Sequence, residues 1–271
     1  MKSLVLCADD FACHAAASQG IAALARAGRL HATSAMVLSP RWAGDAPLLR
    51  ELRGRIDVGL HLDWTSDFAI AAGHGMALGA AMRRAVLGGF DAAAARAVIE
   101  RQLDRFEACW QAPPDHVDGH QHVQQFAGIR EALVEVLARR YPGHAPWLRI
   151  SRVLPPAQAG LKGRIIGWLG ADALEKVAAS ARLPCAAGLC GVYDFKGGGT
   201  RYARLMADWL QAVPEGTLIM CHPAIQAELG DEIGAARAWE FAYLESAGFA
   251  AALAQAGVQL VPGRSLYTAA A

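Results

Sequence analysis

Four short segments of the sequence place aspartate or histidine at the end of an apolar run. They are ADDF (residues 8–11), GLHL (59–62), HVDGHQHV (116–123) and MCHPA (220–224). In the first segment, Asp9 and Asp10 are adjacent at the end of what reads as a buried strand. Two neighbouring carboxylates repel each other, and burying an unpaired charge costs several kcal/mol. A cationic group is therefore expected beside this pair.

Each segment taken alone has an ordinary structural explanation. A single histidine at a strand end, such as His61, is more often a hydrogen-bonded structural residue, and adjacent aspartates commonly form a turn or cap a helix. The HVDGHQHV segment is more informative, because side chains at alternate positions of an extended chain point the same way. Four strand ends that all carry aspartate or histidine favour a functional site over coincidence.

Aspartate together with two histidines is a suitable ligand set for a divalent metal such as Zn, Mn, Fe, Co or Ni. A metal would also explain the pair of aspartates at the first strand end. One carboxylate would bind the cation, and the other would stay ionised nearby and accept a proton from a water molecule that the cation activates. The residues therefore predict a metal site with a carboxylate base beside it.

The elements that position these residues follow from the hydrophobic pattern. Strands are expected at 3–8, 32–38, 56–62, 115–118, 147–150, 184–189, 217–221 and 257–261. Helices are expected at 16–27, 91–111, 126–140, 163–181, 200–212 and 236–256. Repeated β-α order favours a parallel sheet or barrel, with a doubly wound open sheet as the alternative.

Seven or eight β-α units over residues 1–271 fit one irregular, TIM-barrel-like (β/α) barrel domain better than an open sheet. In a barrel, the loops after the strands line one mouth, so the four motif segments would converge there. The glycine-rich segments 65–90 and 190–199 are expected to be loops that form lids or substrate walls.

The composition implies neither nucleic acid nor a membrane as a partner. The formal net charge is +1, from 26 basic and 25 acidic residues, so there is no overall field to attract nucleic acid or an anionic membrane surface. No apolar run approaches the roughly 20 residues of a membrane span, and the apolar stretch at the N-terminus is too short for a signal peptide. The six cysteines show no Cys-x-x-Cys spacing and read as reduced core thiols of a cytoplasmic protein.

In order and spacing, the four motif segments resemble those of the YdjC-like carbohydrate deacetylases, over residues 4 to about 225. That family includes chito-oligosaccharide deacetylases and deacetylases of hopanoid glycan biosynthesis. The resemblance implies an irregular (β/α) barrel, a homodimer and one divalent metal ion, with Zn or Mg favoured over Mn, Co or Ni. The implied substrate is a small-molecule or lipid-linked acetylated amino sugar.

The resemblance also implies roles for the first three motifs. The metal ligands would be Asp10, His61 and His120, with water filling the remaining positions. Asp9 would be the general base of a hydrolysis that removes the N-acetyl group.

The last motif would supply the general acid. His222 is expected in that role, with His122 as its support or its rival. Two positions depart from the family pattern: Ala12 stands where glycine is usual, and Gln124 stands where a further histidine is common. Neither is a proposed ligand.

Aromatic and basic side chains near the motifs are candidates for substrate binding, among them Phe68 in the first glycine-rich segment. Trp64, next to the GLHL motif, offers a flat apolar surface for a sugar, although it could equally be a packed residue at a strand end. Tyr193 lies in the second glycine-rich segment. Arg149, like its neighbour Arg152, could pair with Asp9 or with an anionic group of the substrate.

Two other classes of function remain open at this stage. A different barrel metalloenzyme, such as a sugar isomerase or phosphoesterase, would use the same aspartate and histidine ligands on another bond. A non-catalytic metal-binding or glycan-binding relative is the other alternative. It would have no use for an unligated Asp9 beside Asp10, nor for His222.

Overall fold

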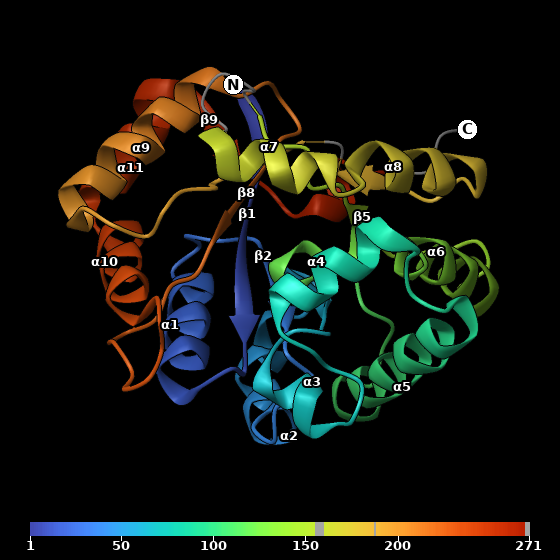
Figure 1. The fold of residues 1–271 in the computed structure, drawn as a ribbon. Helices are drawn as coiled ribbons and strands as arrows, with labels where there is room; N and C mark the ends of the chain where they lie inside the picture. Colours follow the sequence, from blue (N-terminus) through green and yellow to red (C-terminus); the bar gives the residue numbers. More distant parts are fainter. Residues whose placement is uncertain (155–159, 187, 269–271) are drawn as a thin grey trace.

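A nine-stranded parallel sheet forms the centre of the computed structural model, which describes residues 1–154, 160–186 and 188–268 (Figure 1). Eight of the strands follow the order β6-β5-β4-β3-β2-β1-β8-β7, and the ninth pairs with the beginning of β1. The strands are β1 (Lys2–Phe11), β2 (Ala32–Ala35), β3 (Asp57–Leu62), β4 (His116–Gly119), β5 (Trp147–Arg149), β6 (Cys185–Ala186), β7 (Leu189–Cys190), β8 (Leu218–Cys221) and β9 (Val258–Leu260).

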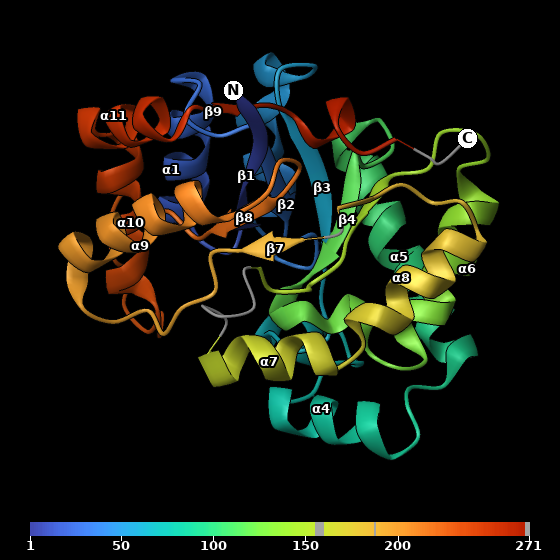
Figure 2. The same ribbon diagram turned by 90° about the horizontal axis from the view of Figure 1, so that it is seen from above.

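Helices follow most strands and cover the outside of the sheet (Figure 2). The α-helices are α1 (Ala15–Arg26), α2 (Trp42–Asp45), α3 (Asp67–Ala71), α4 (Leu78–Leu87), α5 (Ala92–Trp110), α6 (Ile129–Arg140), α7 (Gly160–Trp168), α8 (Ala171–Ser180), α9 (Gly198–Ala212), α10 (Gly234–Glu245) and α11 (Ala247–Ala256). Short 3-10 helices are η1 (Ala46–Leu52), η2 (His120–Gln125) and η4 (Gly263–Ser265).

The two ends of the eight-strand order meet in one short segment of chain. β6 pairs with β5, and β7, a few residues later, pairs with β8. Val153, just after β5, also forms an isolated parallel bridge to Leu189. The sheet is therefore a nearly closed barrel, and the predicted irregular (β/α) barrel is confirmed.

β1 is a strand of the barrel wall and is buried from Leu4 to Phe11. It pairs with β2 on one side and with β8 on the other, so both of its edges are hydrogen-bonded. A strand enclosed in this way needs apolar residues at consecutive positions, which explains the unbroken run that precedes Asp9. The two aspartates lie near the end of this buried strand.

Seven of the eight expected strands form, but four other expectations about the elements were wrong. The single strand expected at 184–189 is two short strands, β6, which pairs with β5, and β7, which pairs with β8. The single helix expected at 163–181 is two helices, and Gly170, with φ 136°, lies at the break between them. The helix expected at 236–256 is also two, because Ser246 caps the start of α11 by accepting a hydrogen bond from the Phe249 amide. The segment 65–90, expected as loop, contains α3 and α4.

No helix in the described ranges is both long and apolar enough to cross a lipid bilayer.

Candidate active site

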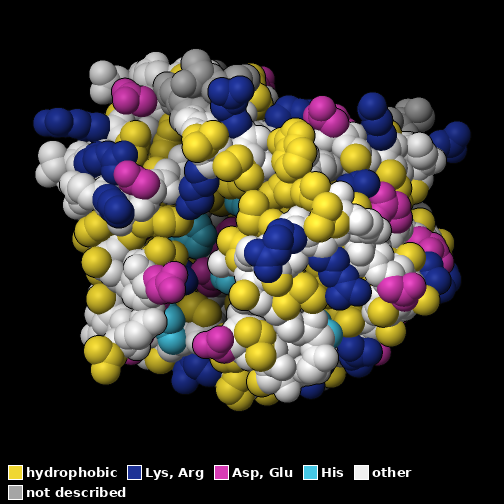
Figure 3. Space-filling model, in the orientation of Figure 1, with side chains coloured by type: hydrophobic (Ala, Val, Ile, Leu, Met, Phe, Trp, Pro, Cys, Tyr) yellow, Lys and Arg dark blue, Asp and Glu magenta, His cyan; other side chains and the backbone are white. Residues whose placement is uncertain are grey.

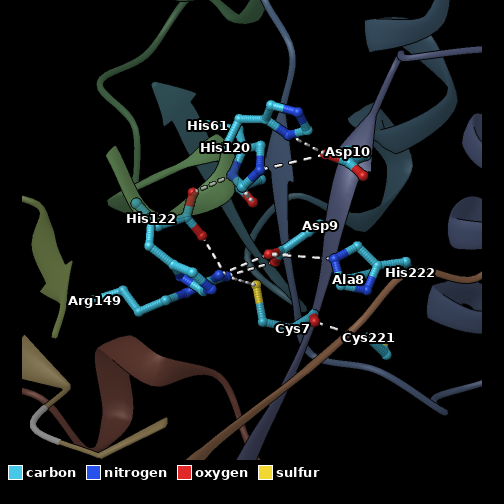
Figure 4. Close-up of polar contacts among 12 residues, drawn as sticks. Cys7, Ala8, Asp9, Asp10, His61, His120, His122, Arg149, Cys221 and His222 are labelled. Atoms are coloured by element: carbon cyan, nitrogen blue, oxygen red, sulfur yellow. Dashed lines mark hydrogen bonds and ion pairs between the residues drawn. The ribbon is translucent and has the colours of Figure 1, made fainter. Parts of the chain in front are cut away.

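The residues of the four motifs meet at the mouth of the barrel (Figure 4). They come from the end of β1, from β3, from the turn after β4 and from the end of β8. Parallel strands of a barrel end at the same rim, so positions far apart in the sequence become neighbours there. A hollow on this face exposes histidine and acidic side chains (Figure 3).

An irregularity in β1 lets both aspartates serve the site. The pairing register with β2 shifts between Ala8 and Phe11, and Asp10 has a φ of 66°. Neighbouring residues of a regular strand point to opposite faces, and a non-glycine residue with positive φ is uncommon. The distortion therefore gives Asp9 and Asp10 separate partners at one rim.

The three expected metal ligands lie together. Nε2 of His61 lies 3.3 Å from Oδ1 of Asp10, and Nδ1 of His120 lies 3.1 Å from the same oxygen. One ligand atom from each residue lies within 4.8 Å of the others. Two imidazole nitrogens and a carboxylate oxygen are thus directed at one point.

The second oxygen of Asp10 is occupied by an arginine. The Arg237 guanidinium donates to Oδ2 of Asp10 at 2.8 Å and to Asp231 at 2.7 Å. Burial alone would raise the pKa of Asp10, but Arg237 and the hydrogen bonds from both histidines hold this pKa well below its usual range. Asp10 is therefore ionised, with one oxygen left for a ligand.

His61 is oriented from behind by a buried carboxylate. Its Nδ1 lies 2.6 Å from Oδ1 of Asp118, which points Nε2 at Asp10. Burial lowers the pKa of His61, but Asp118 and Asp10 together outweigh this effect and raise it to about 10. A carboxylate behind a ligating histidine is a recurrent feature of metal sites, because it fixes the orientation of the ring.

Arg149 crosses the barrel interior to the other aspartate. Its two terminal nitrogens donate to the two oxygens of Asp9 at 2.6 and 2.7 Å, and it also pairs with Asp118. The side chain is fully buried. Burial raises the pKa of Asp9, but the Arg149 charge and hydrogen bonds produce a net lowering. Asp9 is therefore a carboxylate in this environment.

The donor set of Asp10, His61 and His120 fits a divalent metal such as Zn better than any neighbouring combination. Among the described residues, two further groups have potential ligand atoms within 4.8 Å of one another, and both groups contain Asp118. The Arg149 cation, which pairs with Asp118, would repel a metal at either of them. The cation that the paired aspartates predicted is thus partly supplied by two arginines, Arg237 and Arg149.

His222 lies beside Asp9 at the end of β8. Its Nε2 is 4.0 Å from Oδ2 of Asp9, and the ring of Phe195 lies edge-to-face against it at 5.3 Å. The backbone amide of His222 donates to Glu240 at 2.6 Å. Burial lowers the pKa of this imidazole to about 4, despite the opposing effect of Asp9. His222 is therefore neutral at pH 7.

The histidines of the third motif do not all point the same way, so that expectation was wrong. β4 ends at Gly119, and the next residues form a 3-10 turn in which His122 has a φ of 64°. His116 lies fully buried and stacks on Trp147 at 4.2 Å. His122 lies 3.0 Å from the Ser151 hydroxyl instead, and burial lowers its pKa to about 3.

A model of the YdjC-like protein family matches residues 3–255. The chain belongs to this family. A mouse (Mus musculus) protein named carbohydrate deacetylase is 30% identical over 182 residues, covering 63% of this chain and 55% of the relative. The chain thus spans about half the length of that curated relative.

A solved structure shows the same fold. The crystal structure of a proposed cellobiose-phosphate cleavage protein from Enterococcus faecalis covers 98% of this chain and 99% of its own, with a TM-score of 0.71 and 21% identity. At this identity the similarity establishes the architecture alone. Any function proposed for this YdjC-like chain must therefore rest on the geometry of its own site as well as on the fold.

The residues expected to bind substrate are all buried in this YdjC-like chain. Trp64 is 2% exposed and packs against His74 and Phe90. The Tyr193 hydroxyl donates to Glu240 at 2.6 Å.

For Arg149, the structure favours the pairing with Asp9 over contact with a substrate anion, because its guanidinium is enclosed by carboxylates. Arg152 instead forms ion pairs with Asp172 and Glu175. The structure thus shows protein partners for Trp64, Tyr193 and Arg149, and substrate binding by them stays a prediction.

Two residues of the site were missed from the sequence, and both lie on α10. Arg237 holds Asp10, and Glu240 holds the backbone of His222. They are three positions apart on the buried face of the helix. Opposite charges at i and i+3 within an apolar helix face were the available signal. The role of Asp118 was also missed, although the third motif contains it.

Proposed function

We propose that this YdjC-like chain is a metal-dependent carbohydrate deacetylase, which hydrolyses the N-acetyl group of an amino sugar, free or lipid-linked. One observation carries the proposal: three converging metal donors lie beside a separate carboxylate, Asp9, that Arg149 keeps ionised. The name of the mouse relative supports the reaction class. Hydrolysis of an amide needs a metal or oxyanion site and a base, and this arrangement offers both.

Asp10, His61 and His120 are the residues that would hold the metal. When bound, a divalent ion at such a site polarises a carbonyl and lowers the pKa of water. Arg237 occupies the far oxygen of Asp10, which leaves that carboxylate to bind through its other oxygen. Asp118 keeps the outward nitrogen of His61 directed at the same point.

Asp9 is the proposed general base. It is not one of the three donors, it is ionised, and it lies next to Asp10 at the rim. Its two hydrogen bonds to Arg149 fix the carboxylate in one orientation. A positioned base of this kind accepts a proton from the attacking water and typically contributes about 10²–10⁴-fold to the rate.

His222 is the proposed general acid for the departing amine. Burial makes it a neutral imidazole near pH 7, so it must gain its proton during the reaction. The Asp9 carboxylate, 4.0 Å away, becomes the nearest acid once it has accepted a proton from water. His222 then delivers the proton to the amine nitrogen, with His122 as the rival donor from the third motif.

Acetate release from a panel of N-acetylated amino sugars tests this proposal. The panel includes N-acetylglucosamine, chito-oligosaccharides and a glycolipid that carries N-acetylglucosamine. We expect acetate and free amine to appear in equal amounts from at least one member. If no member yields acetate while the protein holds its metal, the deacetylase proposal is wrong and another bond must be the target.

We further propose that the protein is cytoplasmic and forms a homodimer. All six cysteines are free, as expected in a reducing compartment. The dimer rests on the family resemblance, and sedimentation velocity of the purified protein measures it.

A further inference from the structure

The large apolar side chains that are exposed to solvent lie around the mouth of the barrel, at the carboxyl ends of its strands. Apart from Met1, the exposed large apolar side chains among the described residues are those of Ile70, Val86, Leu87, Leu161, Ile165, Trp168, Ile225 and Leu229. Each lies in a segment that follows the carboxyl end of β3, β5 or β8. The mouth of the barrel is therefore bordered by apolar surface.

Two neighbouring helices contribute most of this surface. On α7, Leu161, Ile165 and Trp168 are 75%, 38% and 72% exposed, and their spacing of four and three residues places them on one helix face. On α4, Val86 and Leu87 are 52% and 83% exposed. Figure 2 shows α7 next to α4, Figure 1 shows α7 above α4 on the same face of the molecule, and hydrophobic side chains gather on that face (Figure 3).

The charge of these two helices has one sign. Residues 68–90 and 160–171 contain no aspartate or glutamate. The same segments carry Arg83, Arg84, Lys162 and Arg164, all exposed. The net charge of +1 for the whole chain conceals this local excess of positive charge.

We propose that the exposed faces of α4 and α7 dock onto the surface of an anionic lipid bilayer. An apolar helix face with basic neighbours binds at the headgroup boundary, where tryptophan is also favoured. Lysine and arginine add attraction to anionic lipids.

A second copy of the chain fits this surface less well. In a two-fold contact each patch would face its own copy, which would bring like charges together. An anionic bilayer complements the basic side chains of both helices at once.

Docking in this way would turn the mouth of the barrel toward the headgroups. The inference does not depend on the proposed deacetylase activity, because it rests on exposure and charge alone. It therefore remains testable if no acetylated sugar is found to be a substrate.

Co-sedimentation with vesicles tests the proposal on the full chain. Vesicles of phosphatidylcholine with one quarter phosphatidylglycerol are compared with pure phosphatidylcholine at low and high salt. We expect binding to the anionic vesicles that weakens as salt is added. Failure of the wild-type chain to bind them at low salt overturns the proposal.

A charge-reversed double variant and a matched control assign the surface. Arg83→Glu with Arg164→Glu should weaken binding at least about tenfold. The control is Arg50→Glu with Arg55→Glu, which reverses two exposed charges in the segment leading into β3, at the opposite end of the barrel. The control should bind like the wild type. An equal loss in both variants would mean that overall charge, rather than this surface, drives binding, and would overturn the proposal.

Trp168 supplies a direct optical readout. It is 72% exposed, whereas the other six tryptophans are buried or half-buried. Brominated lipids should therefore quench part of the fluorescence, and Trp168→Leu should abolish the quenching while retaining the binding.

Sedimentation velocity of the wild type and of the Arg83→Glu, Arg164→Glu variant tests whether a second copy of the chain, rather than a bilayer, occupies this surface. A dimer that this variant dissociates, together with no vesicle binding by the wild type, would assign the surface to a second copy and overturn the proposal.

Discussion

Arg149 and Asp9 form a two-pronged ion pair inside the barrel, with nitrogen–oxygen distances of 2.6 and 2.7 Å. The arginine also pairs with Asp118, which orients His61. One cation thus connects the proposed base to the orientation of a proposed metal ligand. Its removal would deprive both buried carboxylates of their arginine and leave Asp118 with its contact to His61.

Replacing this cation should be costly. Arg149→Met keeps much of the side-chain volume but removes the positive charge that pairs with Asp9 and Asp118. We therefore expect the free energy of unfolding to fall by about 3–5 kcal/mol. Urea unfolding measures the loss. Arg201→Met is the control, because its pair with Asp194 is about half exposed and should contribute about 1 kcal/mol or less. Equal losses in the two variants would contradict the account of Arg149.

Substitutions at the site should separate metal binding from catalytic turnover. Asp10→Ala and His120→Ala should lose the bound metal, because each removes one of three donors. Asp9→Asn should keep it, since Asp9 belongs to a different hydrogen-bonded group. Elemental analysis of the purified variants gives the stoichiometry. Full metal content in Asp10→Ala would show that the ligand set is wrong.

Asp118 should tune the metal without binding it. Asp118→Asn leaves the three donors in place but weakens the hold on His61, so we expect metal affinity to fall about 10–100-fold. A competition titration with a chromophoric chelator measures the affinity. Unchanged affinity would mean that the His61 ring is held by its packing and not by this carboxylate.

Glu240 should make stability depend on pH. Burial raises the pKa of this carboxyl from 4.5 to about 7, despite hydrogen bonds from the His222 amide and Tyr193. Between these two values the unfolded chain is ionised at this position while the folded chain retains its proton. Stability should therefore fall as the pH rises through this window, by up to about 3 kcal/mol.

The Glu240→Gln variant isolates this effect, because its side chain does not titrate. Urea unfolding of both proteins at pH 4.5 and pH 8 gives the comparison. The wild type should lose stability relative to the variant as the pH is raised. Parallel curves would show that Glu240 is ionised throughout.

The sequence was sufficient to predict the barrel and the convergence of Asp10, His61 and His120 at one point. Parallel strands end at one rim, so a local pattern at each strand end predicts a meeting in space. For contacts that cross the fold, the local pattern does not name the partner. The charges of Arg237 and Glu240 on one face of α10 indicate that both need a partner, but Arg237 reaches Asp10 across 227 positions of chain.

The sequence pattern also could not predict the directions of two side chains, those of His122 and Arg149. The direction of His122 depends on backbone angles in the turn after β4, where two successive residues have positive φ. The inward direction of Arg149 depends on the placement of β5, a strand of only three residues. For Arg149 the sequence offered both a carboxylate partner and a substrate anion, and only the fold distinguishes them.

The most direct test of the account is acetate release by metal-stripped protein with Zn, Mg, Mn, Co or Ni added back, and Asp9→Asn as the blank. We predict that acetate forms from an N-acetylated amino sugar only when a metal is restored, and that the Asp9→Asn protein, with its metal bound, loses at least about 100-fold in rate. Full turnover by the stripped protein, or by Asp9→Asn, would contradict the mechanism proposed for this site.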